Sequence, residues 1–151
     1  MNKRDLRILI IFGGTSSERE ISISTGREIY QTLSNTYSAD MLDIGSEINN
    51  IHEHIKDYDL IFNALHGGYG ESGEIQGFFE SEGIDFIGSG SEACSIAINK
   101  KKCKKIAIEL GIKSPPSRDL DPFFEDFDKP FIIKPNQEGS SVGFFIVNNK
   151  K

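Results

Sequence analysis

The chain has 151 residues, of which 37% are hydrophobic and 26% charged, a composition typical of a globular domain or of a small domain plus part of another. Its net charge of −6 argues against nucleic acid as a partner, because polyanion binding needs a basic surface. No apolar stretch is long enough to cross a bilayer or to serve as a secretory signal, so we expect a cytoplasmic protein without a membrane partner.

The first two thirds of the chain alternate strand and helix patterns. Arg7–Phe12 is a β-branched run that ends at glycines, typical of a strand covered on both faces. Further strands are predicted at Tyr37–Ile44, Tyr58–Leu65 and Asp85–Gly88, and helices at Glu18–Leu33 (with Ile21, Ile29 and Leu33 as its apolar positions), Ile48–Lys56 and Glu74–Glu82. This alternation predicts an α/β fold with a parallel sheet and crossover helices.

The composition changes in the last third. A helix is predicted over Ser91–Leu110, with a break near Asn99. It is followed by Lys113–Pro130, which is acidic and holds four of the five prolines. Two more strands are predicted at Pro130–Pro135 and Val142–Val147. The boundary between two domains therefore falls between Glu92 and Pro116, and we assign residues 1–95 to the first domain and 96–151 to the second.

The segment Gly13–Glu20 follows the first predicted strand, and open parallel sheets bind ligands beyond the carboxyl ends of their strands. It lacks the G-x-G-x-x-G spacing of a dinucleotide site. Ser16 or Ser17 is expected to cap the helix that follows. For Glu18 two interpretations stay open: the helix dipole stabilises this carboxylate at the start of the helix, or the carboxylate faces the crevice and pairs with a substrate ammonium.

The segment His66–Gly77, "HGGYGESGEIQG", holds five glycines in twelve residues. That density indicates positive φ angles or close approach of the backbone to a ligand. A single histidine at such a place is either a hydrogen-bonded structural residue or a residue of the site, since strand-end loops often carry function. The two interpretations of His66 have equal support from the sequence.

The segment Lys134–Gly143, "KPNQEGSSVG", combines a lysine with glycine and serine. Lys134 could contact phosphate as a point charge, and the amides of Gly139, Ser140 and Ser141 could form an anion-binding concavity. It is not a P-loop, because the lysine precedes the glycines. A plain hairpin connection is the alternative. In the lysine-rich run Ile98–Ile108, Lys100 is the residue that could turn towards a nucleotide.

Metal binding is not expected from this chain itself. Cys94 and Cys103 are too few and too poorly spaced for a disulfide frame or a zinc site. We expect both cysteines to pack as small apolar residues.

In order, four segments closely resemble the D-alanine–D-alanine ligase family of the ATP-grasp superfamily. They are "GGTSSEREISISTG", "HGGYGESGEIQG", "IGSGSEACSIAINKKKCK" and "FIIKPNQEGSSVG". The resemblance covers nearly the whole chain, from Arg7 to Val147. Two positions depart from the family pattern, since Ser72 and Asn99 each stand where an aspartate is usual. Other ATP-grasp ligases, such as glutathione-synthetase-like or carboxylase-like enzymes, share the lysine strand and the glycine loop but not the first two segments.

The resemblance implies a Rossmann-like, pre-ATP-grasp domain over residues 1–95, which binds D-alanine, and the beginning of an ATP-grasp lobe over residues 96–151. Such ligases use ATP and Mg²⁺ to form an acyl phosphate of one D-alanine, which a second D-alanine attacks. The dipeptide enters peptidoglycan synthesis and so contributes to cell-wall formation and cell shape. Carried over by position, the D-alanine residues are Glu18, Ile21 and His66, and the ATP residues are Lys100, Lys134, Gly139, Ser140 and Ser141. Glu18 and Ser140 are the catalytic pair, joined by a hydrogen-bond network.

The resemblance also implies that such a ligase continues well past Lys151, with the metal-binding acidic residues in the later part. We therefore expect this portion, a truncated ligase, to be inactive alone, and residues 114–151 to be incompletely covered. The family's N-terminal domain commonly forms a homodimer, which is the expected partner here. The alternative is a non-catalytic module that binds a ligand or dimerises.

Overall fold

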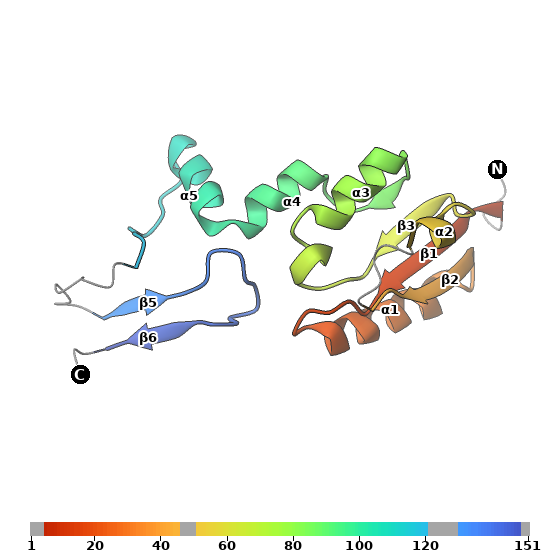
Figure 1. Cartoon of the computed structure of the whole chain (residues 1–151), viewed down its shortest axis with the longest axis horizontal. Coiled ribbons are helices and arrows are strands. Elements are labelled where there is room, and N and C mark those ends of the chain that lie inside the picture. The colour runs from red at the N-terminus through yellow and green to blue at the C-terminus, as the bar shows by residue number, and fades with distance from the viewer. Residues whose placement is uncertain (1–4, 46–50, 121–129, 149–151) are drawn as a thin grey trace. The chain divides into compact units, whose positions relative to one another are not determined.

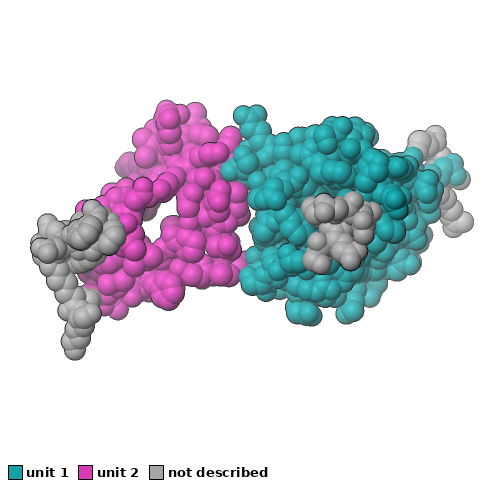
Figure 2. Space-filling view, viewed as in Figure 1, with its two compact units in different colours: residues 1–95 teal, residues 96–151 magenta. Residues whose placement is uncertain are grey.

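The structure is a computed structural model, and it describes residues 5–45, 51–120 and 130–148. The chain divides into two compact units, which Figure 2 colours separately: unit 1, residues 1–95, and unit 2, residues 96–151. Helix α4 (Ser91–Ile98) contains the point of division. No helix in the described ranges is long and apolar enough to span a membrane.

Unit 1 contains a four-stranded sheet, with the strand order β2-β1-β3-β4 and every pairing parallel (Figure 1). Its strands are β1 (Arg7–Phe12), β2 (Ser38–Asp43), β3 (Leu60–Asn63) and β4 (Phe86–Ile87). In β1 the four consecutive residues from Ile8 to Ile11 are buried, which confirms a strand covered on both faces. The predicted parallel α/β sheet is thus confirmed. Strands β3 and β4 are shorter than the predicted strands Tyr58–Leu65 and Asp85–Gly88.

The core lies between one face of the sheet and two helices, α2 (Ile51–Ile55) and α3 (Glu74–Glu82). Its buried members are Leu9, Ile11, Ile44, Ile51, Ile55, Ile61, Leu65, Ile75 and Phe79. Helix α3 ends at Gly83, whose left-handed backbone (φ +67°) allows the cap that the sequence predicts. The start of the second predicted helix, Ile48–Asn50, lies outside the described residues.

Helix α1 (Arg19–Leu33) covers the opposite face of the sheet (Figure 1). The sequence predicts Ile21, Ile29 and Leu33 as its apolar positions, and this is wrong for Ile21, which is 53% exposed. The buried residues of α1 are Ser22 and Gly26. A Cβ at Gly26 would lie 2.8 Å from the Cβ of Phe12, so the helix approaches β1 more closely than a larger residue would allow.

Unit 2 contains helix α5 (Lys100–Glu109) and an antiparallel hairpin of β5 (Phe131–Ile133) and β6 (Phe145–Val147). The predicted helix break falls at Asn99, whose side chain caps α5 by accepting a hydrogen bond from the Lys102 amide at 3.0 Å. Apolar residues of the hairpin are exposed, among them Ile132 (56%), Phe145 (63%) and Ile146 (61%), as expected for incomplete cover. Cys94 is half-buried and Cys103 is exposed, so the prediction of an apolar environment is wrong for Cys103.

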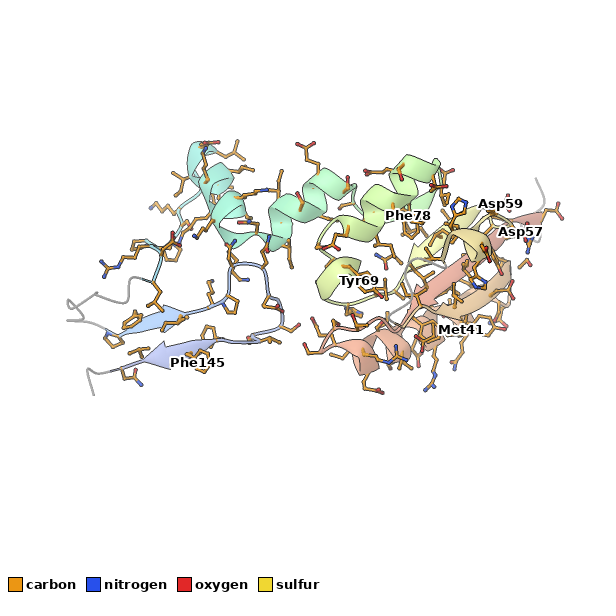
Figure 3. All side chains as sticks on the ribbon, in the orientation of Figure 1. Met41, Asp57, Asp59, Tyr69, Phe78 and Phe145 are labelled. Carbon is orange, nitrogen blue, oxygen red and sulfur yellow. The ribbon has the colours of Figure 1, made fainter. Side chains whose placement is uncertain are left out.

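The two environments of phenylalanine predict a contrast in stability. Phe79 is fully buried in unit 1, and its replacement by alanine should lower the free energy of unfolding of unit 1 by about 3–5 kcal/mol through lost burial and a cavity. Phe145, labelled in Figure 3, is 63% exposed on β6, so F145A should cost less than about 1 kcal/mol. Urea denaturation measures both. Equal losses in the two variants would contradict this picture of the core.

Candidate functional site

The carboxyl ends of β1 and β3 are joined by a buried hydroxyl. Ser22 of α1 is fully buried; its Oγ donates a hydrogen bond to Ala64 O at 2.7 Å and accepts one from the Gly13 amide at 2.8 Å. Gly13 follows β1 and Ala64 follows β3. The segment that begins at Gly13 and the segment that contains Ala64 and His66 are therefore both held against α1 by Ser22.

Glu18 and His66 are brought together by these two segments. Ser16 Oγ donates to His66 O at 2.5 Å and accepts from the Glu18 amide at 3.1 Å. Gly67 has a φ of +64°, and a Cβ there would lie 2.9 Å from Glu18 Oε2. The carboxylate of Glu18 thus lies close to the α-carbon of Gly67, and the positive φ of that residue favours glycine there. Ser16 binds the amide just before α1, but it does not act as the predicted N-cap, a position that Glu18 occupies.

The imidazole ring of His66 lies between two side chains. Thr25 Oγ1 is 3.0 Å from its Nε2, and Glu71 Oε1 is 3.7 Å from its Nδ1. Thr25 comes from α1, and Glu71 follows the short helix η3 (Gly68–Gly70). The ring is about one third exposed. These contacts give His66 the hydrogen-bonded surroundings that the first of its two sequence interpretations describes.

An ion pair fixes the outer side of the first segment. The guanidinium of Arg19 binds both carboxylate oxygens of Asp43, at 2.9 and 2.5 Å, and it also donates to Gly14 O at 3.1 Å. The hydrogen bonds from Arg19, together with one from the Gly45 amide, lower the pKa of Asp43. A Cβ at Gly13 (φ +87°) would lie 2.1 Å from Asp43 Oδ1, so this position also needs glycine. Tyr69, labelled in Figure 3, adds a further contact at this end of the sheet, where the carboxyl ends of β1 and β3 lie, by donating to Gly45 O at 3.0 Å.

Comparison with known proteins agrees with the geometry. A family model for the N-terminus of D-Ala–D-Ala ligase matches residues 45–89. The D-alanine–D-alanine ligase of Fusobacterium nucleatum is 42% identical over 147 residues, covering 97% of this chain and 50% of that protein. The crystal structure of the ligase from Bacillus anthracis superposes with a TM-score of 0.84 at 37% identity, over 96% of this chain and 50% of that one. A structure of that ligase complexed with ATP gives a TM-score of 0.81 at 36% identity, over 96% and 51%.

The chain is a relative of D-alanine–D-alanine ligases and corresponds to their N-terminal part. It spans about half the length of the curated relatives that it matches. The fold predicted from the family resemblance is confirmed by these structural relatives.

Two of the three site residues that the ligase resemblance assigns to unit 1 lie at the carboxyl ends of β1 and β3. Glu18 and His66 converge there, whereas Ile21 lies on the exposed side of the first turn of α1. Their contact with D-alanine stays a prediction.

In unit 2 the structure brings Lys100 to the segment that holds the other nucleotide residues. The Lys100 amide donates to Asn136 O at 3.0 Å, and its ammonium donates to Glu138 O. Lys134 is exposed at the end of β5. Ser140 and Ser141 have left-handed backbones, with φ of 45° and 61°, and β5 and β6 are antiparallel, as in the hairpin interpretation. Whether Lys100, Lys134, Gly139, Ser140 and Ser141 bind ATP stays a prediction.

Both departures from the ligase pattern have local partners. Ser72 Oγ donates to Glu74 Oε1 at 2.9 Å at the start of α3, and Asn99 caps α5. The described residues contain no group of three or more His, Cys, Asp or Glu side chains that could hold a metal ion.

Two polar residues of this edge, Ser22 and Thr25, carry contacts that the sequence reasoning missed. A signal was present, because Glu18, Ser22 and Thr25 follow one another at intervals of four and three and therefore share a helix face. A search for apolar periodicity passes over such a face, since its members are small and polar.

The Arg19–Asp43 pair predicts a pH dependence of stability. Because the pKa of Asp43 is lowered on folding, its pairing contributes fully above the ordinary carboxyl value of 3.8 and is lost as the pH falls through the lower value of the folded state. Asp43→Asn should therefore reduce the urea midpoint at pH 7, with a difference from the unmodified chain that shrinks below pH 3.8. Asp57→Asn, which removes another exposed carboxylate (Figure 3), should leave the midpoint close to that of the unmodified chain. A difference for D43N that stays constant with pH would exclude the pair as its cause.

Proposed function

We propose that the chain is the N-terminal part of an ATP-dependent D-alanine–D-alanine ligase, a cytoplasmic enzyme of peptidoglycan precursor synthesis. The observation that carries the proposal is the convergence of two family motifs on one sheet edge, where the Glu18 carboxylate lies against Gly67 and Ser16 bridges to His66. The similarity over 97% of this chain to a curated ligase supports it.

Unit 1 is the domain that binds the first D-alanine. The carboxylate of Glu18 holds the ammonium group of the amino acid, and Ile21 and His66 lie beside it. A carboxylate–ammonium contact is a charge-assisted hydrogen bond, worth about 1.5–3 kcal/mol when its partners are fixed. Glu18 is well suited to this role because its own amide donates to Ser16 Oγ, and the carbonyl of nearby Gly67 accepts from the Gly70 amide at 3.1 Å.

Unit 2 is the start of the ATP-grasp lobe. The ammonium groups of Lys100 and Lys134 balance phosphate charge, and Gly139, Ser140 and Ser141 lie along the phosphates. The fit rests on the hydrogen bonds from Lys100 to the segment that follows β5, which place one cation beside that segment. ATP supplies the phosphoryl group, and the role of these residues is to hold it in position.

Glu18 and Ser140 are the residues that we assign to catalysis, through the hydrogen-bond network that the family resemblance implies. Mg²⁺ is the expected metal cofactor. We place its ligands in the part of the ligase that this chain does not cover, as the family resemblance implies. Homodimerisation through unit 1 is the partner interaction that we propose. The second candidate, a module that binds D-alanine or dimerises without catalysis, is favoured by the exposed apolar residues of β5 and β6.

The ammonium-binding role predicts a selective loss of D-alanine affinity. Glu18→Gln keeps the size of the side chain and removes its charge, so the affinity for D-alanine should fall tenfold or more, about the value of one charge-assisted hydrogen bond. NMR titration of the ¹⁵N-labelled chain measures it. Glu20→Gln, which removes an exposed carboxylate from the same first turn of α1, should change the affinity little. Equal affinities for E18Q and the unmodified chain, or no D-alanine binding at all, would count against the proposal.

The 151-residue chain alone should show no D-alanine-dependent release of ADP, because it covers about half of the ligases that it matches and we place the metal ligands in the other half. A coupled ADP assay measures this, with a full-length ligase as the positive control. D-alanine binding without turnover agrees with either candidate function for the isolated chain. Turnover by the chain itself would refute the view that it is an incomplete catalyst.

A further inference from the structure

We propose that Thr25 is a positioning residue that fixes the tautomer and ring orientation of His66. In this arrangement the neutral imidazole carries its proton on Nδ1, and the lone pair of Nε2 accepts a hydrogen bond from the hydroxyl of Thr25. The observation behind it is the pair of contacts on the ring: Thr25 Oγ1 is 3.0 Å from Nε2, and Glu71 Oε1 is 3.7 Å from Nδ1.

Glu71 and Thr25 favour the same tautomer together: the charge of Glu71 favours a proton on Nδ1, and the hydroxyl of Thr25 stabilises that form by donating to Nε2. A neutral imidazole has one N–H and one lone pair, and the group near each nitrogen selects which is which. With the proton on Nδ1, a positive N–H edge faces the carboxylate. With the proton on Nε2, the lone pair of Nδ1 would face that negative charge at 3.7 Å, which is unfavourable. The Nδ1–H form therefore leaves Nε2 as an acceptor, and the hydroxyl of Thr25 is the donor at hydrogen-bond distance.

The hydroxyl of Thr25 is held in position by the docking of α1. One turn before it, Ser22 is bonded to Gly13 and Ala64, and directly after it Gly26 packs closely on Phe12. A β-branched residue in a helix also has few χ1 rotamers. The hydroxyl of Thr25 therefore has little freedom to move away from the ring of His66. Its hydrogen bond to Nε2 costs little further side-chain entropy.

The consequence for the site rests on the proposed D-alanine function. Because Thr25 and Glu71 face the two ring nitrogens, the ring of His66 has no nitrogen to spare as an acceptor of a substrate proton. Its contribution is to hold the segment from His66 to Glu71 in place. The carbonyl of His66 binds Ser16, and the next residue, Gly67, faces Glu18. Thr25 thus acts on the ammonium-binding carboxylate through His66.

The experiment reads the tautomer directly. Long-range ¹H–¹⁵N NMR of the histidine rings, at a pH where they are neutral, distinguishes protonated from unprotonated ring nitrogens, and His52 and His54 serve as internal references. In the unmodified chain and in Thr25→Ser, His66 should show a single tautomer with Nδ1 protonated. In Thr25→Val, which keeps the shape and removes the hydroxyl, the Nε2 signal should move out of the unprotonated range towards an average of both tautomers.

A matched control is available on the same helix. Thr32 is exposed and donates a hydrogen bond to Glu28 O, one turn earlier in α1, at 3.0 Å, so Thr32→Val should leave the His66 signals unchanged. An Nε2–H tautomer in the unmodified chain, or an unchanged Nδ1–H tautomer in T25V, would overturn the proposal. If T25V does not fold, the His66 tautomer is compared between the unmodified chain and Thr25→Ala, which also lacks the hydroxyl. A chain with the expected tautomer but no affinity for D-alanine would refute the proposed function and leave the role of Thr25 supported.

Discussion

The arrangement of unit 1 depends on the buried hydroxyl of Ser22. The parallel ladder ends near Gly13 and Ala64, and the amide and carbonyl left there would be buried without partners if Ser22 did not bind both. A hydroxyl can do so because it donates one hydrogen bond and accepts others. The partners come from separate segments, so the contact sets both the position of α1 along the sheet and the separation of the two glycine-bearing segments. Glu18 and Thr25 lie one turn to either side of Ser22, and their positions follow from the same contact.

Close packing of α1 gives this edge its chemical character. Where a helix docks through leucine or isoleucine, its axis stands far enough from the sheet to bury large side chains. Here Ser22 and Gly26 form the contact instead, and the first turn of α1 reaches the backbone beyond β3. Gly67, with its positive φ, lies there, and a Cβ on it would come within 2.9 Å of the Glu18 carboxylate. The Arg19–Asp43 pair then holds the outer side of the same turn. The carboxylate that we assign to D-alanine is thus supported from several directions.

The elements of this fold follow from local sequence, whereas their contacts do not. The β-branched run of β1, the glycine after α3 and the break at Asn99 each have a local physical cause, and all three were predictable. Apolar periodicity did not predict the buried face of α1, because it marks large residues and close packing selects small ones. The surroundings of His66 were not predictable either, since Thr25 and Glu71 come from other segments and meet it only through the parallel topology. The order of the four segments indicated the family. The patterns around single residues, such as Glu18 and His66, left the roles of those residues open.

The segment between β5 and β6 shows how structure can weigh alternatives that sequence leaves equal. A plain hairpin connection places glycine or asparagine where the backbone is left-handed. Here Ser140 and Ser141 take that conformation consecutively, at a cost of about 1–2 kcal/mol each relative to glycine. Glycine at either position would remove that cost and would also remove a hydroxyl. Strain of this kind persists where the surrounding structure or a function requires it. A local cause is present here, because the Val142 amide donates to Gly139 O at 2.9 Å and so closes a turn around the two serines, as the hairpin interpretation describes.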